Sequence, residues 1–292
     1  MELNKIYQGD CLELLKQVEN ESVDCIVTSP PYNKHSAKRK CSKTDSWTKA
    51  NIDYGNFKDD LPEQEYQEQQ KMVLRECLRV LKKDGSIFYN HKPRIVNHKT
   101  IFPHEWLSGF NVRQMIVWNR KSSPVLEPIR FMPCVEYIFW ITKERKTPKF
   151  NPQAFQYKEV WEISPKPLPG HPAPFPEEVV ERCLKATTEK GDVVLDPYMG
   201  SGTTAKVSKK MGRMFIGFEL NPQFIETATQ EINRLSEIGE TQTQLSNESC
   251  PNGEFNKDLT AQEEPSPKSV TQTSLNPDIM FNLNGGLPAG CN

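Results

Sequence analysis

One stretch of this 292-residue chain decides its fold: Val193-Val194-Leu195-Asp196-Pro197-Tyr198-Met199-Gly200-Ser201-Gly202-Thr203-Thr204. Its apolar beginning predicts a short buried strand that ends at Asp196. Gly200 and Gly202 then allow a turn in which another molecule can approach the backbone closely. The residues after the turn predict a helix through Lys210. A strand, a glycine turn and a helix in this order form the building unit of a doubly wound α/β sheet.

A second strand follows this unit and ends in an acidic residue. It is predicted at residues 214–218 and leads into Glu219, about 20 residues after the first strand. Glycines for close approach, a helix N-terminus for negative charge and an acid for ribose hydroxyls together predict a nucleoside-binding crevice. A dinucleotide-binding turn would have a third glycine where Ala205 stands, and a P-loop would have Gly-Lys-Ser/Thr after the turn.

Earlier in the chain, Thr28-Ser29-Pro30-Pro31-Tyr32 follows an apolar run at residues 23–27 that predicts another buried strand. Two consecutive prolines cannot donate backbone hydrogen bonds, so the strand must stop there. The stop presents the Ser29 hydroxyl, the Pro30 carbonyl and the Tyr32 ring at the carboxyl end of a strand, where α/β sheets bind ligands. A purely local proline-rich turn is the alternative interpretation.

Apolar periodicity predicts the remaining elements. Strands are expected at residues 6–7, 86–90, 110–118 and 134–142, and helices at residues 11–18, 63–81, 177–186 and 224–235. A turn at residues 82–85 is expected to separate the helix at 63–81 from the strand that follows. Helices that alternate with strands favour a Rossmann-like, doubly wound, mostly parallel sheet with helices on both faces.

The segments between these elements are informative as well. Residues 1–235 are expected to form one domain, in which the aperiodic residues 143–170 leave room for a small recognition element. Residues 171–176 are rich in proline and predict an extended arm. Residues 236–292 hold few aliphatic side chains, which predicts a disordered, acidic and polar tail.

Charge is distributed unevenly along the chain. The net charge of −1 combines a balance of −6 in residues 235–292 with a balance of +5 in residues 1–234. The polar residues 33–60 are expected to form a basic loop over the mouth of the site. Candidate DNA contacts in it are Lys38, Arg39, Lys40, Lys43 and Trp47. Cations and aromatics in one loop suit phosphate contact and base stacking, although a solvated insertion would look similar.

Two of these motifs carry a family resemblance. Ser29-Pro30-Pro31-Tyr32 resembles the catalytic motif of the amino-group DNA methyltransferases, which is Ser/Asp/Asn-Pro-Pro-Tyr/Phe. The stretch at residues 196–204 resembles the S-adenosylmethionine motif of the same family, usually Asp-Pro-Phe/Tyr-x-Gly-Ser-Gly-Thr. The catalytic motif comes first, then the proline-rich arm and then the cofactor motif, which is the permuted order of the β class.

The resemblance implies catalytic roles for Ser29, Pro30, Pro31 and Tyr32. It implies contacts with S-adenosyl-L-methionine for Asp10, His171, Pro172, Phe175, Asp196, Pro197, Gly200, Ser201, Gly202, Thr203, Glu219 and Asn221. Asp196 would lie by the methionine end of the cofactor and Glu219 would bridge the ribose hydroxyls. The loop containing Asp10 would contact the adenine ring, and the arm would pack on the methionine moiety.

The implied reaction is methyl transfer to an exocyclic amino group of a base flipped out of duplex DNA. Within the family, serine at the first motif position is associated mostly with N4 of cytosine and aspartate mostly with N6 of adenine, so cytosine N4 is the favoured target. Adenine N6 is the alternative, and a DNA-binding module without turnover is a third. Methylation at cytosine C5 would need a cysteine nucleophile, and Cys134 is expected to be buried and inert at the start of a strand.

Several classes of protein and site are disfavoured. There is no long apolar run and no signal peptide at Met1-Glu2-Leu3-Asn4-Lys5, so neither a membrane protein nor a secreted one is expected. The eight cysteines are scattered without metal-binding spacing, which favours a reduced, cytoplasmic protein without a metal site. Expected partners are double-stranded DNA and a cognate restriction endonuclease.

Overall fold

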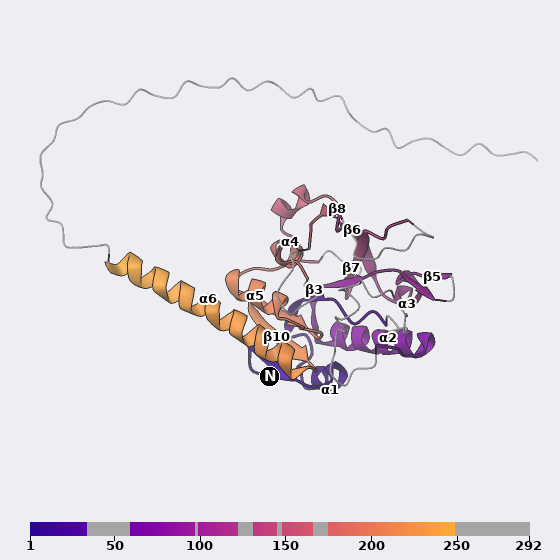
Figure 1. Cartoon of the computed structure of the whole chain (residues 1–292), viewed down its shortest axis with the longest axis horizontal. Coiled ribbons are helices and arrows are strands. Elements are labelled where there is room, and N and C mark those ends of the chain that lie inside the picture. Colours follow the sequence, from indigo (N-terminus) through magenta and orange to yellow (C-terminus); the bar gives the residue numbers. More distant parts are fainter. Residues whose placement is uncertain (34–58, 97–98, 122–130, 145–147, 166–174, 249–292) are drawn as a thin grey trace, which may run out of the picture. The chain divides into compact units, whose positions relative to one another are not determined.

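The computed structural model describes residues 1–33, 59–96, 99–121, 131–144, 148–165 and 175–248, with residues 236–248 described by their backbone alone (Figure 1). Among these residues, no helix is both long and apolar enough to cross a membrane.

The described residues form a main sheet of eight strands. Their order across the sheet is β1 (Lys5–Gln8), β10 (Met214–Glu219), β9 (Val193–Asp196), β2 (Val23–Thr28), β3 (Leu81–His91), β7 (Val135–Thr142), β6 (Val112–Asn119) and β8 (Val160–Glu162). The strands from β1 to β3 in this order are parallel. Strand β7 runs antiparallel to both β3 and β6, and β8 runs parallel to β6. The expected mostly parallel sheet is confirmed.

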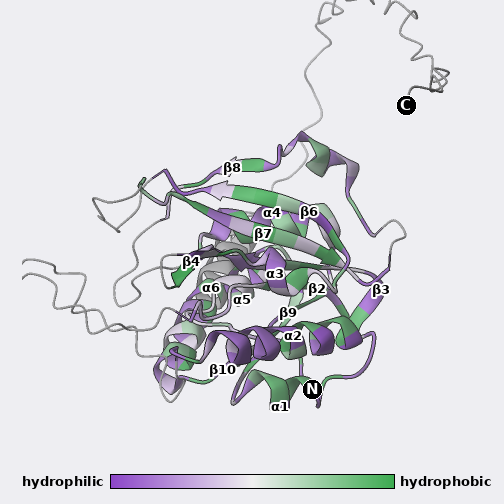
Figure 2. Cartoon of the chain, turned by 90° about the vertical axis from the view of Figure 1, so that its right-hand side faces the viewer, coloured by the Kyte–Doolittle hydropathy of each residue, from purple (hydrophilic) through white to green (hydrophobic). Residues whose placement is uncertain are grey.

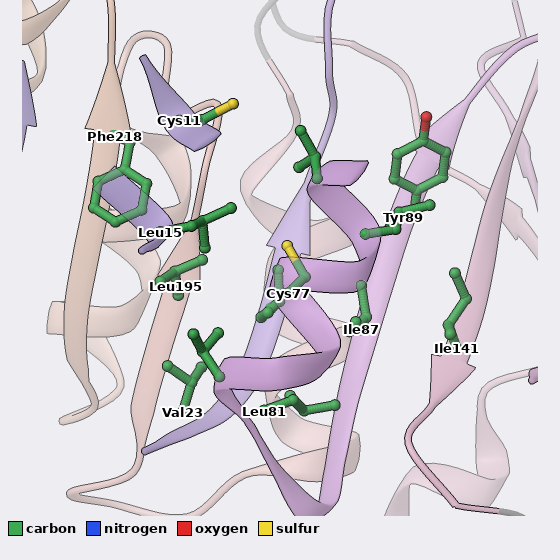
Figure 3. Close-up of a cluster of buried hydrophobic side chains, with 14 of the residues drawn as sticks. Cys11, Leu15, Val23, Cys77, Leu81, Ile87, Tyr89, Ile141, Leu195 and Phe218 are labelled. Carbon is green, nitrogen blue, oxygen red and sulfur yellow. The ribbon is translucent and has the colours of Figure 1, made fainter. Parts of the chain in front are cut away.

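Helices cover both faces of this sheet, as expected (Figure 1). They are α1 (Cys11–Leu15), α2 (Glu63–Val80), α3 (His104–Leu107), α4 (Glu177–Thr187), α5 (Thr203–Lys210) and α6 (Pro222–Glu248). Side chains of α1, α2 and α3 join one hydrophobic cluster, part of which is drawn in Figure 3. Side chains of α4 and α5 join a second cluster on the other face.

Strand β2 shows why both faces must be covered. Ile26 belongs to the cluster under α1 and α2, whereas its neighbours Cys25 and Val27 belong to the cluster under α4 and α5. Successive residues of a strand point to opposite faces, so a run that is apolar throughout requires a helix layer on each side. In Figure 2, β7 is likewise largely hydrophobic, whereas the visible side of α2 is largely hydrophilic.

The turn expected between the helix at 63–81 and the next strand is wrong. Strand β3 begins at Leu81, directly after α2. The register between β2 and β3 shifts between Val23, opposite Leu81, and Cys25, opposite Ser86. Residues 82–85 are therefore accommodated as a bulge beside β2, which the local Lys-Lys-Asp-Gly pattern does not reveal because a bulge depends on the partner strand.

The predicted end of the last helix is also wrong. Helix α6 continues through Glu248, beyond the expected end at Leu235. The residues past Leu235 are polar but include glutamate and glutamine, which have good helix propensity, so polarity alone was a poor indicator of the boundary. Residues 249–292 of the expected tail lie outside the described part of the chain.

Sequence patterns gave no indication of three small elements. Strands β4 (Arg94–Val96) and β5 (Lys99–Ile101) pair antiparallel, and α3 follows them. The described part of residues 143–170 contains a 3₁₀ helix, η1 (Pro152–Gln156), and the edge strand β8, whose Trp161 is buried in the second cluster. A recognition role for this segment stays a prediction.

Candidate active site

The parallel strands β1, β10, β9, β2 and β3 bring their carboxyl ends to one edge of the sheet. The strand order reverses between β9 and β2, because the chain passes outward from β9 to β10 on one side and from β2 to β3 on the other. Ligands of open α/β sheets bind at such a switch point. Glu219, Asp196 and Ser29 lie at the ends of β10, β9 and β2, so this edge brings the predicted cofactor and catalytic motifs together.

The glycine turn between β9 and α5 has left-handed backbone at Gly200 (φ 54°) and Gly202 (φ 87°). A Cβ atom at Gly202 would lie 2.6 Å from the Cβ of Ala228 in α6, so only glycine lets α6 pack here. Among the described residues, no side chain caps the start of α5, where the N-cap residue is Gly202. Such a helix start favours a negatively charged ligand group.

Glu219 closes the other side of this turn. Its Oε2 accepts a hydrogen bond from the Gly200 N–H (2.8 Å), and its Oε1 accepts from the N–H groups of Leu220 (2.9 Å) and Asn221 (2.8 Å). Burial raises the pKa of the Glu219 carboxyl, although the hydrogen bonds from Asn221, Gly200 and Leu220 oppose this. The carboxylate therefore holds the turn against the end of β10.

Asp10 and Asn221 begin the helices that start beside this turn. Strand β1 pairs with β10, and the Gly9 N–H donates to the Glu219 carbonyl (3.0 Å). Asp10 is exposed and caps α1 by accepting from the N–H of Leu12 (2.9 Å). Asn221 is buried at the start of α6, and its Oδ1 accepts a hydrogen bond from the Gln223 N–H (2.9 Å).

Asp196 connects the two halves of the edge. It is buried, and its Oδ1 accepts from the Thr28 hydroxyl (2.7 Å) and from the Tyr198 N–H (3.0 Å). Its Oδ2 accepts from the Thr204 hydroxyl (2.7 Å). Burial raises the pKa of Asp196 to about 6, although the hydrogen bonds from Thr204 and Thr28 oppose the change. The contacts that the structure places on this carboxylate join β9, β2 and α5 to one another.

The catalytic motif is held from α2 and β3. The Tyr66 hydroxyl donates to the Pro31 carbonyl (2.7 Å) and also contacts Nε2 of His91 (2.8 Å). No hydrogen bond reaches the Pro30 carbonyl from the described residues. The Tyr32 ring packs on His91 with 4.6 Å between ring centroids. Burial lowers the pKa of His91 to about 3, so this support is uncharged at neutral pH.

A polar cluster that the sequence did not predict surrounds Ser29 and Tyr32. The Ser29 and Tyr32 oxygens are 2.8 Å apart, and the Tyr32 hydroxyl donates to Oε2 of Glu136 (2.9 Å). Asn90 Nδ2 lies 2.7 Å from the Tyr32 oxygen and 2.9 Å from Glu136 Oε2. Arg120 Nη1 donates to Oε1 of Glu136 (2.8 Å). These five residues are called the Glu136 cluster below.

The members of the Glu136 cluster come from four neighbouring strands. Asn90 lies near the end of β3, Arg120 follows β6, and Glu136 lies near the start of the antiparallel β7, so all reach the same edge. A signal was present in the sequence, because Glu136 is a carboxylate within an otherwise apolar run. A buried charge without a partner is costly, so a glutamate in a core strand indicates a specific contact.

The other predicted cofactor residues are placed as follows. Pro197, Ser201 and Thr203 belong to the glycine turn and the start of α5. Phe175 lies just before α4, and its ring meets Trp118 edge-on with 5.9 Å between centroids. The remaining predicted residues lie outside the described part of the chain: His171, Pro172, Lys38, Arg39, Lys40, Lys43 and Trp47.

The cysteines in the described part of the chain separate into two groups. Burial raises the pKa of the thiols of Cys11, Cys25, Cys77 and Cys183, which opposes thiolate formation. Cys134 is only partly buried, so its expected burial at the start of a strand is wrong. The reason is that β7 begins one residue later, at Val135.

Comparison with known proteins agrees with this geometry. A family model described as DNA methylase, for N6 and N4 methyltransferases, matches residues 23–230. The chain belongs to this family. The type II methyltransferase M.BglII of Bacillus subtilis is 32% identical over 269 residues, which cover 78% of this chain and 68% of that protein. M.HinfI of Haemophilus influenzae, also a type II methyltransferase, is 29% identical over 257 residues, and the match covers 80% of this chain and 69% of that protein.

Solved structures share the fold. The cytosine-N4-specific PvuII DNA methyltransferase superimposes with a TM-score of 0.62 at 22% identity, covering 78% of this chain and 85% of that chain. A Thermus thermophilus protein assigned as a DNA modification methylase, solved with S-adenosyl-L-methionine, has a TM-score of 0.58 at 25% identity, covering 79% and 93%. S-adenosyl-L-methionine is the cofactor of this N6/N4 DNA methylase.

The described residues fit this cofactor. Its carboxylate suits the uncapped start of α5, and its ribose hydroxyls suit the Glu219 carboxylate at the end of the adjacent strand. The left-handed backbone at Gly200 (φ 54°) suits a turn that a ligand approaches closely, whereas Gly202 makes room for α6. The chemistry of these donors and acceptors therefore matches a nucleoside that carries an amino acid.

Proposed function

We propose that this DNA methyltransferase transfers a methyl group from S-adenosyl-L-methionine to N4 of a cytosine that is flipped out of duplex DNA. The observation that carries the proposal is Ser29 at the first position of the catalytic motif, partly exposed at the switch point of the sheet. The specificity of the PvuII enzyme for cytosine N4 supports the same target.

The chemistry requires hydrogen-bond acceptors more than it requires a base. An exocyclic amino nitrogen is a poor nucleophile because its lone pair is conjugated into the ring, and it gains positive charge as it attacks. The Ser29 oxygen and the Pro30 carbonyl would accept the two amino hydrogens and so stabilise that charge. When bound, S-adenosyl-L-methionine supplies a methyl group that its sulfonium has already activated.

Alignment is the second contribution of the chain. The hydroxyl of Thr28, the residue before Ser29, donates a hydrogen bond to Asp196 (2.7 Å). The cofactor turn and the catalytic motif are therefore held as one unit. Holding two reactants in a fixed geometry makes an otherwise bimolecular step effectively unimolecular. In this proposal Tyr32 stacks on the flipped base, and residues 33–60 contact phosphates.

The class of the two curated relatives supports a place in restriction and modification. M.BglII and M.HinfI are both type II methyltransferases. The partner proposed here is accordingly a restriction endonuclease that cuts the sequence this enzyme methylates. Double-stranded DNA is the proposed substrate.

The test identifies the modified base directly. The chain is incubated with duplex DNA and S-adenosyl-L-methionine labelled in its methyl group, and the DNA is digested to nucleosides that are separated by chromatography. Label in N4-methyldeoxycytidine supports the proposal, whereas label in N6-methyldeoxyadenosine supports the alternative target. DNA binding without any transfer of label would indicate a non-catalytic module.

A further inference from the structure

The Glu136 cluster contains few groups that can choose between donating and accepting. Side-chain nitrogens of Asn90 and Arg120 act only as donors here. Glu136 forms an ion pair with Arg120 (2.8 Å), and its carboxylate acts only as an acceptor. The hydroxyls of Tyr32 and Ser29 are therefore the two groups whose direction has to be decided.

The direction of the Tyr32 hydroxyl follows from its neighbours. Within the Glu136 cluster, its single proton can go to Glu136 Oε2 at 2.9 Å or to Ser29 Oγ at 2.8 Å. A hydrogen bond to an ionised acceptor is roughly twice as strong as one between neutral groups, so the proton goes to the carboxylate. The Tyr32 oxygen then accepts from Asn90 (2.7 Å) and offers its other lone pair to Ser29.

The direction of the Ser29 hydroxyl follows in turn. Its proton is donated to the Tyr32 oxygen, which has no proton left for it. The two hydrogens of Asn90 Nδ2 are engaged by Tyr32 and Glu136 at 2.7 and 2.9 Å, both closer than Ser29 at 3.3 Å. The lone pairs of Ser29 thus remain for a donor from outside the cluster.

We propose that Glu136 is a positioning residue of the methyl-transfer reaction, acting through Tyr32 to keep Ser29 in the accepting direction. This inference rests on the proposed function, in which Ser29 accepts a hydrogen from the amino group of the base. An amino group that is about to be methylated offers only hydrogens on that side. A serine whose proton pointed outward would repel it instead of stabilising the developing charge.

Glu136→Gln tests the proposal with nearly the same shape. The amide oxygen stays with Arg120, so the amide nitrogen faces Tyr32 and becomes a donor. Tyr32 must then donate to Ser29, and the Ser29 proton is turned outward. We expect kcat to fall about 100-fold, the usual effect of losing one preorganised polar contact. The dissociation constant of S-adenosyl-L-methionine should be unchanged, because its site lies on the β9 and β10 side of the edge.

Tyr32→Phe provides the decisive second measurement. It keeps the ring but removes the group through which Glu136 reaches Ser29. If Glu136 acts through Tyr32, then E136Q lowers kcat far less in the Y32F background than in the wild type. Contact residues that act as a unit are non-additive in such a double-mutant cycle, whereas a merely structural glutamate would give independent losses.

Two variants control for charge and folding. Asp192→Asn replaces another cation-paired carboxylate, 2.7 Å from Lys149, before the start of β9 at the opposite edge, and should keep full kcat. Glu136→Asp keeps the negative charge for Arg120 and the acceptor for Tyr32, so its kcat should exceed that of E136Q. If E136Q does not fold, Glu136→Asp takes its place in the double-mutant cycle with Y32F.

The outcomes separate this inference from the proposed function. Full kcat in E136Q, or additive losses in the cycle, overturns the role of Glu136 but does not affect the proposal that cytosine N4 is the target. Wild-type label in N6-methyldeoxyadenosine overturns the target base, but the cycle still applies because adenine also presents an amino group. A wild-type chain that transfers no label overturns both.

Discussion

Two glycines with the same positive φ angle allow the packing at the cofactor turn to be measured. Gly202 has φ +87° and Gly191 has φ +86°, so alanine at either position is strained by about 1–2 kcal/mol. The surroundings differ, because a Cβ at Gly202 would lie 2.6 Å from the Cβ and 3.0 Å from the Cα of Ala228, whereas a Cβ at Gly191 would meet nothing within 4 Å. Comparison of the two variants therefore isolates the close contact between the turn and α6.

We expect Gly202→Ala to destabilise the fold more than Gly191→Ala by the cost of overpacking, which is about 1–3 kcal/mol in a well-packed site. Urea unfolding followed by circular dichroism measures both, with the slope of the transition checked for constancy. Ala228→Gly should recover part of the stability in the Gly202 variant, with a coupling of at least about 0.5 kcal/mol. Equal destabilisation in the two alanine variants would refute the reasoning, because backbone strain alone would then explain it.

Three further predictions concern the charged and catalytic residues. Burial raises the pKa of Asp196 from its ordinary 3.8 to about 6, so ionisation weakens the fold as the pH rises between these values. The stability of Asp196→Asn relative to the wild type should therefore grow by about 2 kcal/mol from pH 4 to pH 7 in urea unfolding, and a difference independent of pH would contradict this. Ser29→Ala should lower kcat by about 10²–10³ with unchanged cofactor affinity in equilibrium binding, and full activity would exclude its role as an acceptor. Replacing Lys38, Arg39 and Lys40 by alanine should weaken binding to every DNA sequence alike. The slope of the logarithm of the binding constant against the logarithm of the salt concentration should fall by about one unit for each phosphate that the loop no longer binds. Identical slopes for the two proteins would mean that this loop does not touch phosphate.

Sequence alone was sufficient where the decisive residues are neighbours in the chain. The glycine turn after Asp196 and the double proline after Ser29 each depend on local backbone rules, since glycine permits left-handed turns and proline ends a strand. Alternation of apolar strands and amphipathic helices was enough to predict the doubly wound sheet. The edge that joins the two motifs then follows from topology, because parallel strands end on the same side.

Tertiary structure decided what distant residues do to one another. The bulge after Leu81 depends on the register with β2, and Asp196 owes its raised pKa to burial, which only the packing of β9 between β10 and β2 provides. The Glu136 cluster is the clearest case, since four strands supply its members. Glu136 could be noticed as a charge in an apolar run, but its partner could not be named. Hydrogen-bond direction is set by all the neighbours together, and those neighbours are adjacent only after the sheet has formed.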